Sequence, residues 1–292
     1  MRILTFDIED WFHILDHDQT RAEADWERYP SRVEANVERI LEMLERHNQK
    51  ATFFVLGWIA RRHPGVVRMI GDRGHQFGTH SDTHQLVYEQ SRQEFADDLR
   101  RSIDVLEQTC GRKIRFYRAP GFSIVAGCEW AFEALVRAGI EVDCSVFPAK
   151  RTHGGLPDWR IDGPAVLDTP AGPLKLLPMS VWRVLDQSVV FSGGGYFRLL
   201  PAVLLDRLFA RQPYVMTYFH PRDFDPGQPV LAGLPMSRRF KSYVGLAGAM
   251  GKLERLVGSL DFMDIAAAEA GIDWSAVPRI DPVGSAQLHP TR

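Results

Sequence analysis

Short apolar segments alternate with amphipathic segments through the first half of the chain. The run Ala51–Leu56 is continuously apolar and rich in Phe and Val, as expected of a strand covered on both faces. Between residues 31 and 48, apolar side chains recur at helical spacing, which predicts an amphipathic helix, and Ser31 with Glu34 fits a capping box at its start. Repeated strand–helix pairs predict a parallel sheet or barrel, in which reactive residues gather at the carboxyl ends of the strands.

The same alternation predicts the remaining elements. Further strands are expected at residues 2–6, 75–79, 113–118, 141–145, 214–219 and 262–263, and further helices at residues 66–72, 91–110, 130–138, 201–211 and 246–257. Residues 147–195 are rich in Pro and Gly, as in THGGLPDW and SGGGYFR, and predict long loops over the carboxyl-terminal face of a barrel. The sequence therefore predicts one α/β domain over residues 1–272, followed by a loose tail at 273–292.

Composition and charge narrow the class of protein and of partner. The chain has 292 residues, of which 45% are hydrophobic and 25% charged, as in ordinary folded proteins. A formal net charge of -2 gives no electrostatic reason to expect nucleic acid as a partner. The longest apolar run, residues 51–60, is shorter than the ~20 residues of a membrane helix, so no transmembrane segment is expected. The amino terminus lacks a signal-peptide pattern and the 3 cysteines lack CxxC spacing, so we expect a cytoplasmic protein.

Two histidines, His80 and His84, stand four residues apart in the segment HSDTH, just after a predicted strand. On one helical turn or a tight loop they would converge on a common point, and neutral imidazole is the commonest protein ligand of zinc. Such a pair alone is more often two surface or capping histidines. The acids Asp7, Glu9 and Asp10, at the end of the first predicted strand, support a metal site because buried carboxylates need a counter-charge. Spacing leaves either Glu9 or Asp10 as the third ligand.

Other predicted strand ends carry residues suited to catalysis. His220 closes a strand and is a candidate general acid. Arg118 would orient a carboxylate, and a backbone N–H just after Pro120 would face an oxyanion. Asp143 would hold His220 in one tautomer and raise its pKa.

Five segments in this order, TFDIED, HSDTH, RAPG, DCSVFP and YFHP, resemble the five motifs of a known family. This is the polysaccharide deacetylase family, the chitooligosaccharide deacetylase homology domain of carbohydrate esterase family four. The segments SGGGYFRLLP, YFHPRDFDPGQP and RRFKSYVGL are similar to a subgroup found with bacterial exopolysaccharide synthesis. That subgroup has an extra carboxyl-terminal region, here about residues 150–272. The resemblance implies a distorted (β/α) barrel with about seven parallel strands.

The resemblance also implies roles for single residues. It makes Asp7 the catalytic base, His80 and His84 the metal histidines, Arg118 the arginine that orients the base, Asp143 the partner of the acid, His220 the acid and Gly121 the oxyanion donor. The family motif has two adjacent aspartates, whereas Ile8 follows the first one here, so Glu9 or Asp10 must be the third ligand. Arg222 stands where the subgroup usually has an aromatic residue, so substrate contacts near it should differ.

The resemblance predicts a hydrolase, dependent on a divalent metal expected to be zinc, that removes N-acetyl groups from an amino sugar of a bacterial polysaccharide or its precursor. Water activated by the metal and by Asp7 would attack the acetamide, and His220 would protonate the leaving amine. Candidates for stacking on the sugar are Tyr196, Phe197, Trp159 and Trp182. The alternatives are hydrolysis of a small cyclic or linear amide and a non-catalytic carbohydrate-binding module, although mere binding would not require the acid, the base and the metal ligands together.

Overall fold

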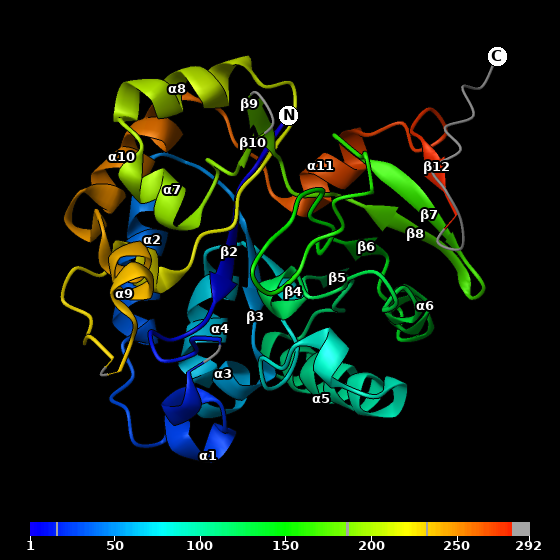
Figure 1. Ribbon diagram of the computed structural model, residues 1–292, viewed down its shortest axis with the longest axis horizontal. Helices are drawn as coiled ribbons and strands as arrows, with labels where there is room; N and C mark the ends of the chain where they lie inside the picture. The colour runs from blue at the N-terminus through cyan, green and yellow to red at the C-terminus, as the bar shows by residue number, and fades with distance from the viewer. Residues whose placement is uncertain (16, 185–186, 232, 282–292) are drawn as a thin grey trace.

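A mostly parallel sheet lies at the centre of the protein. The computed structural model describes residues 1–15, 17–184, 187–231 and 233–281, and Figure 1 shows its strands surrounded by helices. The described residues contain an eight-stranded sheet of order β12-β7-β8-β6-β5-β4-β3-β2, in which all neighbours pair in parallel except β7 with β8. Its strands are β2 (Thr5–Ile8), β3 (Thr52–Val55), β4 (Gln76–Thr79), β5 (Phe116–Tyr117), β6 (Val142–Asp143), β7 (Ala165–Thr169), β8 (Gly172–Leu176) and β12 (Arg279–Ile280).

The beginning of the chain also pairs with a segment more than 200 residues later. Strand β1 (Arg2–Ile3) pairs in parallel with β11 (Val215–Met216), and Phe6 bridges to Phe219. Strand β2 is thus held between β3 on one edge and the segment after β11 on the other. The predicted α/β class and parallel sheet are confirmed, although the pairings among the described residues do not close a complete barrel.

Helices are present at all six ranges where the apolar periodicity predicts them, and the described residues contain five further α-helices that were not predicted. Those of the first half are α1 (Glu23–Trp26), α2 (Val33–Arg46), α3 (Gly57–Arg62), α4 (Pro64–Asp72), α5 (Arg92–Cys110) and α6 (Trp130–Arg137). Those of the second half are α7 (Gly194–Leu199), α8 (Ala202–Arg211), α9 (Met236–Tyr243), α10 (Leu246–Ser259) and α11 (Ile265–Gly271), and in Figure 1 α7 to α10 gather on one side of the sheet. Within the described ranges, no helix is both long and apolar enough to cross a bilayer.

Two local predictions differ from the structure. Helix α2 begins without the predicted capping box, because the Ser31 hydroxyl donates to the Asp10 carboxylate instead. Residues 147–195 are not loops throughout: β7 and β8 form a hairpin that extends the sheet beyond β6, and β9 (Trp182–Val184) pairs with β10 (Gln187–Val189).

The predicted loose tail is ordered where the structure describes it. Strand β12 pairs in parallel with β7, so residues 279–280 belong to the sheet. The rest of the predicted tail, residues 282–292, lies outside the described residues.

Candidate functional site

The two histidines of HSDTH and Glu9 converge at the carboxyl ends of β2 and β4. His80 Nε2 and His84 Nε2 each lie 3.0 Å from Glu9 Oε1. All three side chains are buried, and the three ligand atoms lie within 4.8 Å of one another. Strand β2 ends just before Glu9, and β4 ends just before His80, so the parallel pairing through β3 brings the three residues together.

The chemistry of these three groups fits a cation. His80 Nδ1 lies 2.7 Å from the carbonyl oxygen of Arg118, which only accepts hydrogen bonds, so Nδ1 carries the proton and Nε2 is left with its lone pair. The buried Nε2 of His84 has no hydrogen-bond partner among the described residues. Three acceptors this close repel one another unless a cation lies between them, and a carboxylate with two imidazoles suits zinc.

Asp10 does not take part in this cluster. Its carboxylate accepts hydrogen bonds from the backbone N–H of Trp11 (2.8 Å) and of Arg32 (3.1 Å) and from the Ser31 hydroxyl. Asp10 therefore holds the turn that begins α2. Of the two candidates for the third ligand, the structure places Glu9 with the histidines and Asp10 away from them.

A network from α5 holds the HSDTH loop in its bend. The Asp98 carboxylate accepts hydrogen bonds from the backbone N–H of Asp82 (2.8 Å) and of Thr83 (3.2 Å). The Ser81 hydroxyl accepts from the N–H of His84 at 3.0 Å. Ser81 and His84 both adopt positive φ, 70° and 56°, which costs on the order of 1–3 kcal/mol each for residues with a side chain. The surrounding contacts thus impose a bend that aims His84 at Glu9.

Asp7 lies beside the metal ligands and is paired with a buried arginine. Arg118 Nη1 donates to Asp7 Oδ1 at 2.7 Å and to the Thr5 hydroxyl at 2.8 Å. The Arg118 guanidinium also lies over the ring of Phe54, 4.3 Å from its centre. These contacts fix one carboxylate oxygen of Asp7, while the other, Oδ2, lies 3.9 Å from His220 Nε2.

His220 faces the same point from the far end of the chain. Its Nε2 lies 3.8 Å from Glu9 Oε1, and its Nδ1 lies 3.1 Å from Asp223 Oδ2. Arg198 Nε in turn lies 3.3 Å from Asp223 Oδ1. Burial lowers the pKa of His220, but Glu9, Asp223 and Asp7 outweigh it and raise that pKa to about 9. The imidazole is therefore protonated at neutral pH and suited to donate a proton from Nε2.

Asp143 is not the partner of His220, so that part of the prediction is wrong. The Asp143 carboxylate accepts from the backbone N–H (2.9 Å) and the hydroxyl (2.6 Å) of Ser145. The Ser145 hydroxyl accepts from the N–H of Ala119 at 2.8 Å. Burial raises the pKa of Asp143 to about 7. Asp143 therefore supports the RAPG segment, and Asp223 orients His220.

Gly121, in that segment, lines the same cavity as the base, the metal ligands and the acid. Its φ is 59°, and a Cβ there would lie 2.8 Å from Leu15 Cδ1, so a glycine is needed. Its N–H makes no hydrogen bond within the described part of the chain. The cavity has a volume of about 480 Å³, and Asp7, Glu9, His80, His84 and His220 all reach it. This volume lies in the range of small-ligand sites.

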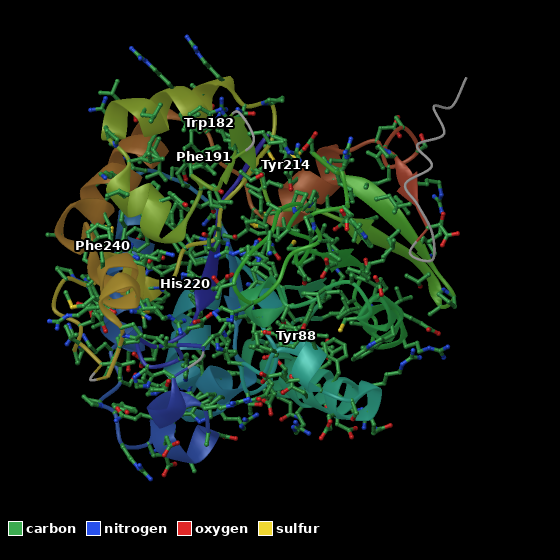
Figure 2. The ribbon with its side chains drawn as sticks, in the orientation of Figure 1. Tyr88, Trp182, Phe191, Tyr214, His220 and Phe240 are labelled. Carbon is green, nitrogen blue, oxygen red and sulfur yellow. The ribbon has the colours of Figure 1, made fainter. Side chains whose placement is uncertain are left out.

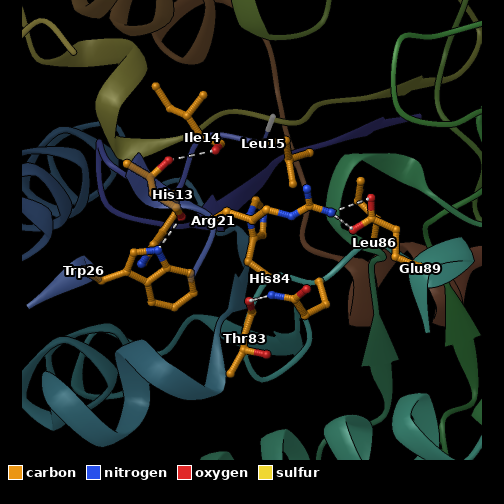
Figure 3. Close-up of a pocket in the computed structure, with 11 residues that line it drawn as sticks. His13, Ile14, Leu15, Arg21, Trp26, Thr83, His84, Leu86 and Glu89 are labelled. Carbon is orange, nitrogen blue, oxygen red and sulfur yellow. Dashed lines mark hydrogen bonds and ion pairs between the residues drawn. The ribbon is translucent and has the colours of Figure 1, made fainter. Parts of the chain in front are cut away.

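A second, much smaller cavity lies on the other side of His84. It has a volume of about 40 Å³ and is lined by His13, Trp26 and His84, with the Arg21–Glu89 ion pair beside them (Figure 3). It has room for water but not for a sugar. Of these two cavities, only the larger has room for a sugar beside the metal ligands.

Three of the four predicted sugar-stacking aromatics lie elsewhere. Phe197 is fully buried and packs against Phe219, and Trp159 stacks on Phe132 at 5.6 Å between ring centres. Trp182 lines a separate cavity, and Figure 2 shows it well away from His220. Tyr196 is 51% exposed and adjoins the cavity-lining Gly195, but it is not itself part of that lining. The predicted roles of Phe197, Trp159 and Trp182 in sugar binding are therefore wrong.

Sequence reasoning missed Asp223 and the arginines of the cavity. Asp223 follows His220 by three residues and accepts from its backbone N–H at 3.0 Å, so the capping-box spacing was a usable signal. Arg151 and Arg198 carry no such local signal, because only the tertiary fold brings them to the cavity.

Two family models match successive parts of the chain. Residues 4–135 match the family model of polysaccharide deacetylase, and residues 144–269 match that of a domain of unknown function, DUF3473. The site takes its metal ligands from the first region and His220 from the second.

Two curated relatives match parts of the chain. The peptidoglycan-N-acetylglucosamine deacetylase of Bacillus cereus is 32% identical over 96 residues, which is 32% of this chain and 35% of that protein. The chitooligosaccharide deacetylase of Azorhizobium caulinodans is 32% identical over 82 residues, 28% of this chain and 39% of that one. The matched segments thus span only about a third of the length of these relatives.

One solved structure has the same fold over nearly the whole chain. It is a putative polysaccharide deacetylase from Mycobacterium smegmatis, with a TM-score of 0.63 and 20% sequence identity, and the match covers 95% of this chain and 91% of that one. At this identity the likeness shows the fold.

Proposed function

We propose that this protein, whose residues 4–135 match the polysaccharide deacetylase family, is a zinc-dependent hydrolase that removes the N-acetyl group from an amino sugar of a polysaccharide or its precursor. The observation that carries this proposal is the convergence of a base, an acid and three metal-ligand atoms on one cavity. The two relatives, one named a peptidoglycan-N-acetylglucosamine deacetylase and the other a chitooligosaccharide deacetylase, support the same chemistry.

Each group of the site has a chemical part in this hydrolysis. Glu9, His80 and His84 would hold the cation, which when bound supplies Lewis-acid polarisation of water and of the acetamide carbonyl. Asp7, aligned by Arg118, accepts the proton of the attacking water at Oδ2. The N–H of Gly121 donates to the oxyanion of the tetrahedral intermediate.

The last step needs a proton on the leaving nitrogen. His220 is protonated at Nδ1 toward Asp223 and at Nε2 toward the cavity, so Nε2 supplies that proton as the carbon–nitrogen bond breaks. The products are acetate and a free amino sugar. Asp7 and His220 lie on the same cavity and divide the proton transfers between them.

The test is release of acetate by chelator-treated protein, with and without added zinc, from N-acetylated oligosaccharides. Zinc-dependent acetate release by wild type, and its loss in Asp7→Asn, is the expected result. If the zinc-loaded protein releases no acetate but opens small cyclic or linear amides, the proposed substrate is wrong. If it binds sugars and turns over neither class, the domain is a binding module.

A further inference from the structure

The cavity that contains the site carries an excess of positive side chains. Its acidic residues are Asp7, Glu9 and Asp223. Each of these already faces a cation or imidazole: Asp7 faces Arg118, Glu9 faces the two metal histidines, and Asp223 faces His220 and Arg198. Its basic residues, apart from the histidines, are Arg151, Arg198, Arg222, Arg238 and Lys241. The acids of the cavity are thus compensated within the site itself, and Arg151 and Lys241 pair with no carboxylate among the described residues.

Arg151 is held in place by aromatic rings. Its guanidinium lies over three aromatic rings, 4.6 Å from the centre of Phe147 and 5.2 Å from the centres of Phe122 and Tyr218. No carboxylate in the described ranges lies within ion-pair distance of it, and its side chain makes no hydrogen bond there. An arginine stacked in this way keeps its edge free for a planar, two-point contact with a carboxylate or phosphate.

The loop that carries Arg151 is fixed against the site. The backbone N–H of Gly155 donates to the carbonyl of Phe122 at 3.1 Å, and a Cβ on Gly154 would lie 2.0 Å from that same carbonyl oxygen. The glycines of THGG therefore let the loop lie directly on Phe122, the residue after the oxyanion candidate Gly121. Tyr218, the other ring beneath Arg151, lies 6.1 Å from the ring of His220.

Two other cations of the same cavity are incompletely paired within the described residues. The Nη2 atom of Arg222 is buried and has no hydrogen-bond partner in the described part of the chain. Lys241 is exposed on α9, and its ammonium pairs with no carboxylate among the described residues. Arg222 occupies the position after His220-Pro221 where an aromatic side chain was expected. The cavity is thus better suited to charge than to sugar stacking at this point.

We propose that the substrate carries an anionic group, a phosphate or a carboxylate, which binds the guanidinium of Arg151 while the acetamide lies at the metal ligands. Arg151 then determines specificity: it selects a charged N-acetylated sugar over a neutral one. This inference rests on the proposed deacetylase function and adds the substrate class. A planar carboxylate and a tetrahedral phosphate each offer two oxygen acceptors that match the edge of an arginine, so their shared chemistry defines the site.

The experiment uses three N-acetylglucosamine oligosaccharides of equal length: a neutral one, one with a phosphate monoester and one with a uronic acid residue. The zinc-loaded wild type should show kcat/KM for acetate release about 10- to 100-fold higher for at least one charged compound, the range expected of hydrogen bonds to a charged group. Comparing the phosphate with the uronate identifies which anion the site takes. Binding of each compound to the same protein is measured by calorimetry.

Three variants separate the role of Arg151 from general effects. Arg151→Gln should bring the charged-to-neutral ratio close to one, and Arg151→Lys, which keeps the charge but not the planar fork, should retain part of the preference. Lys150→Gln removes a charge from the neighbouring, exposed residue outside this cavity and should leave both activity and ratio as in wild type. If Arg151→Gln does not fold, the charged-to-neutral ratio of Arg151→Lys still shows whether the planar guanidinium is needed.

The outcomes distinguish the two proposals. Equal turnover of neutral and charged compounds by wild type, or an unchanged ratio in Arg151→Gln, overturns the anion site and leaves the deacetylase standing. Absence of acetate from all three compounds overturns the deacetylase, and calorimetry then decides the anion site: binding that is stronger for the charged compounds and lost in Arg151→Gln supports it, and equal binding refutes it.

Discussion

Replacing the adjacent acids Glu9 and Asp10 by alanine should affect different properties. Asp10→Ala should mainly lower the stability of the protein, and Glu9→Ala should mainly lower its affinity for zinc. Asp10→Ala removes the acceptor of two backbone N–H groups, of Trp11 and Arg32, and of the Ser31 hydroxyl. Leaving such donors unpaired costs about 1–3 kcal/mol each when buried, and water can reach some of them here, so we expect a loss of about 2–3 kcal/mol in unfolding free energy. Glu9 holds no backbone group, so Glu9→Ala should cost the metal-free protein less than about 1 kcal/mol.

Zinc affinity should fall far more in Glu9→Ala than in Asp10→Ala. Loss of a group that merely supports a ligand typically lowers affinity 10- to 100-fold, so loss of Glu9, a ligand, should lower zinc affinity by at least about 100-fold. Asp10→Ala should bind zinc within about threefold of wild type, since it contacts none of the ligand atoms. Competition against a chromophoric chelator measures affinity, and urea unfolding of chelator-treated protein measures stability. A zinc-binding Glu9→Ala together with a zinc-free but stable Asp10→Ala would refute the ligand assignment.

Three further changes test the rest of the site. Asp7→Asn should retain zinc and lower kcat by about 10²- to 10⁴-fold, the usual contribution of a general base; loss of the metal would show that Asp7 is a ligand. His220 acts as an imidazolium, so activity is present below its raised pKa of about 9 and is lost above it. Asp223→Asn should therefore move the alkaline limb of kcat/KM to lower pH by about one unit, and an unmoved limb would contradict this role. Asp98→Ala should weaken zinc binding about 10- to 100-fold by freeing the loop before His84; unchanged affinity would mean that the loop keeps its bend without it.

The convergence of the site was predictable, because it follows from the order of parallel strands. Asp7 and His80 lie at or just after the ends of β2 and β4, and His220 follows the segment that pairs with β2, so alternating strands and helices were enough to bring them together. The choice between Glu9 and Asp10 was not predictable. It depends on a turn that is held by residues 31–32, which local spacing cannot reveal.

The predictions of sugar-stacking aromatic residues were wrong because the type of a residue does not determine which way its side chain points. Phe197 occupies the inner face of α7, where the helical period points it at Phe219, whereas Tyr196 beside it is exposed. A tyrosine and a phenylalanine next to each other on a helix must face different ways, and sequence alone does not say which faces the cavity. The predicted pairing of Asp143 with His220 was wrong for a related reason. The Asp143 carboxylate accepts its hydrogen bonds from the nearby Ser145.

The bridge between Phe6 and Phe219 also sets an order of events during synthesis. The three metal-ligand side chains have all been translated once residue 84 is made, but the acid that completes the site is residue 220. At the usual pace of translation the interval lasts on the order of 10 seconds. During that time one edge of β2 has not yet paired with the segment that contains Phe219. A nascent chain that binds zinc also lacks His220, so it cannot yet protonate a leaving amine. The site is therefore complete only when the region matched by DUF3473 has folded back onto the first strand.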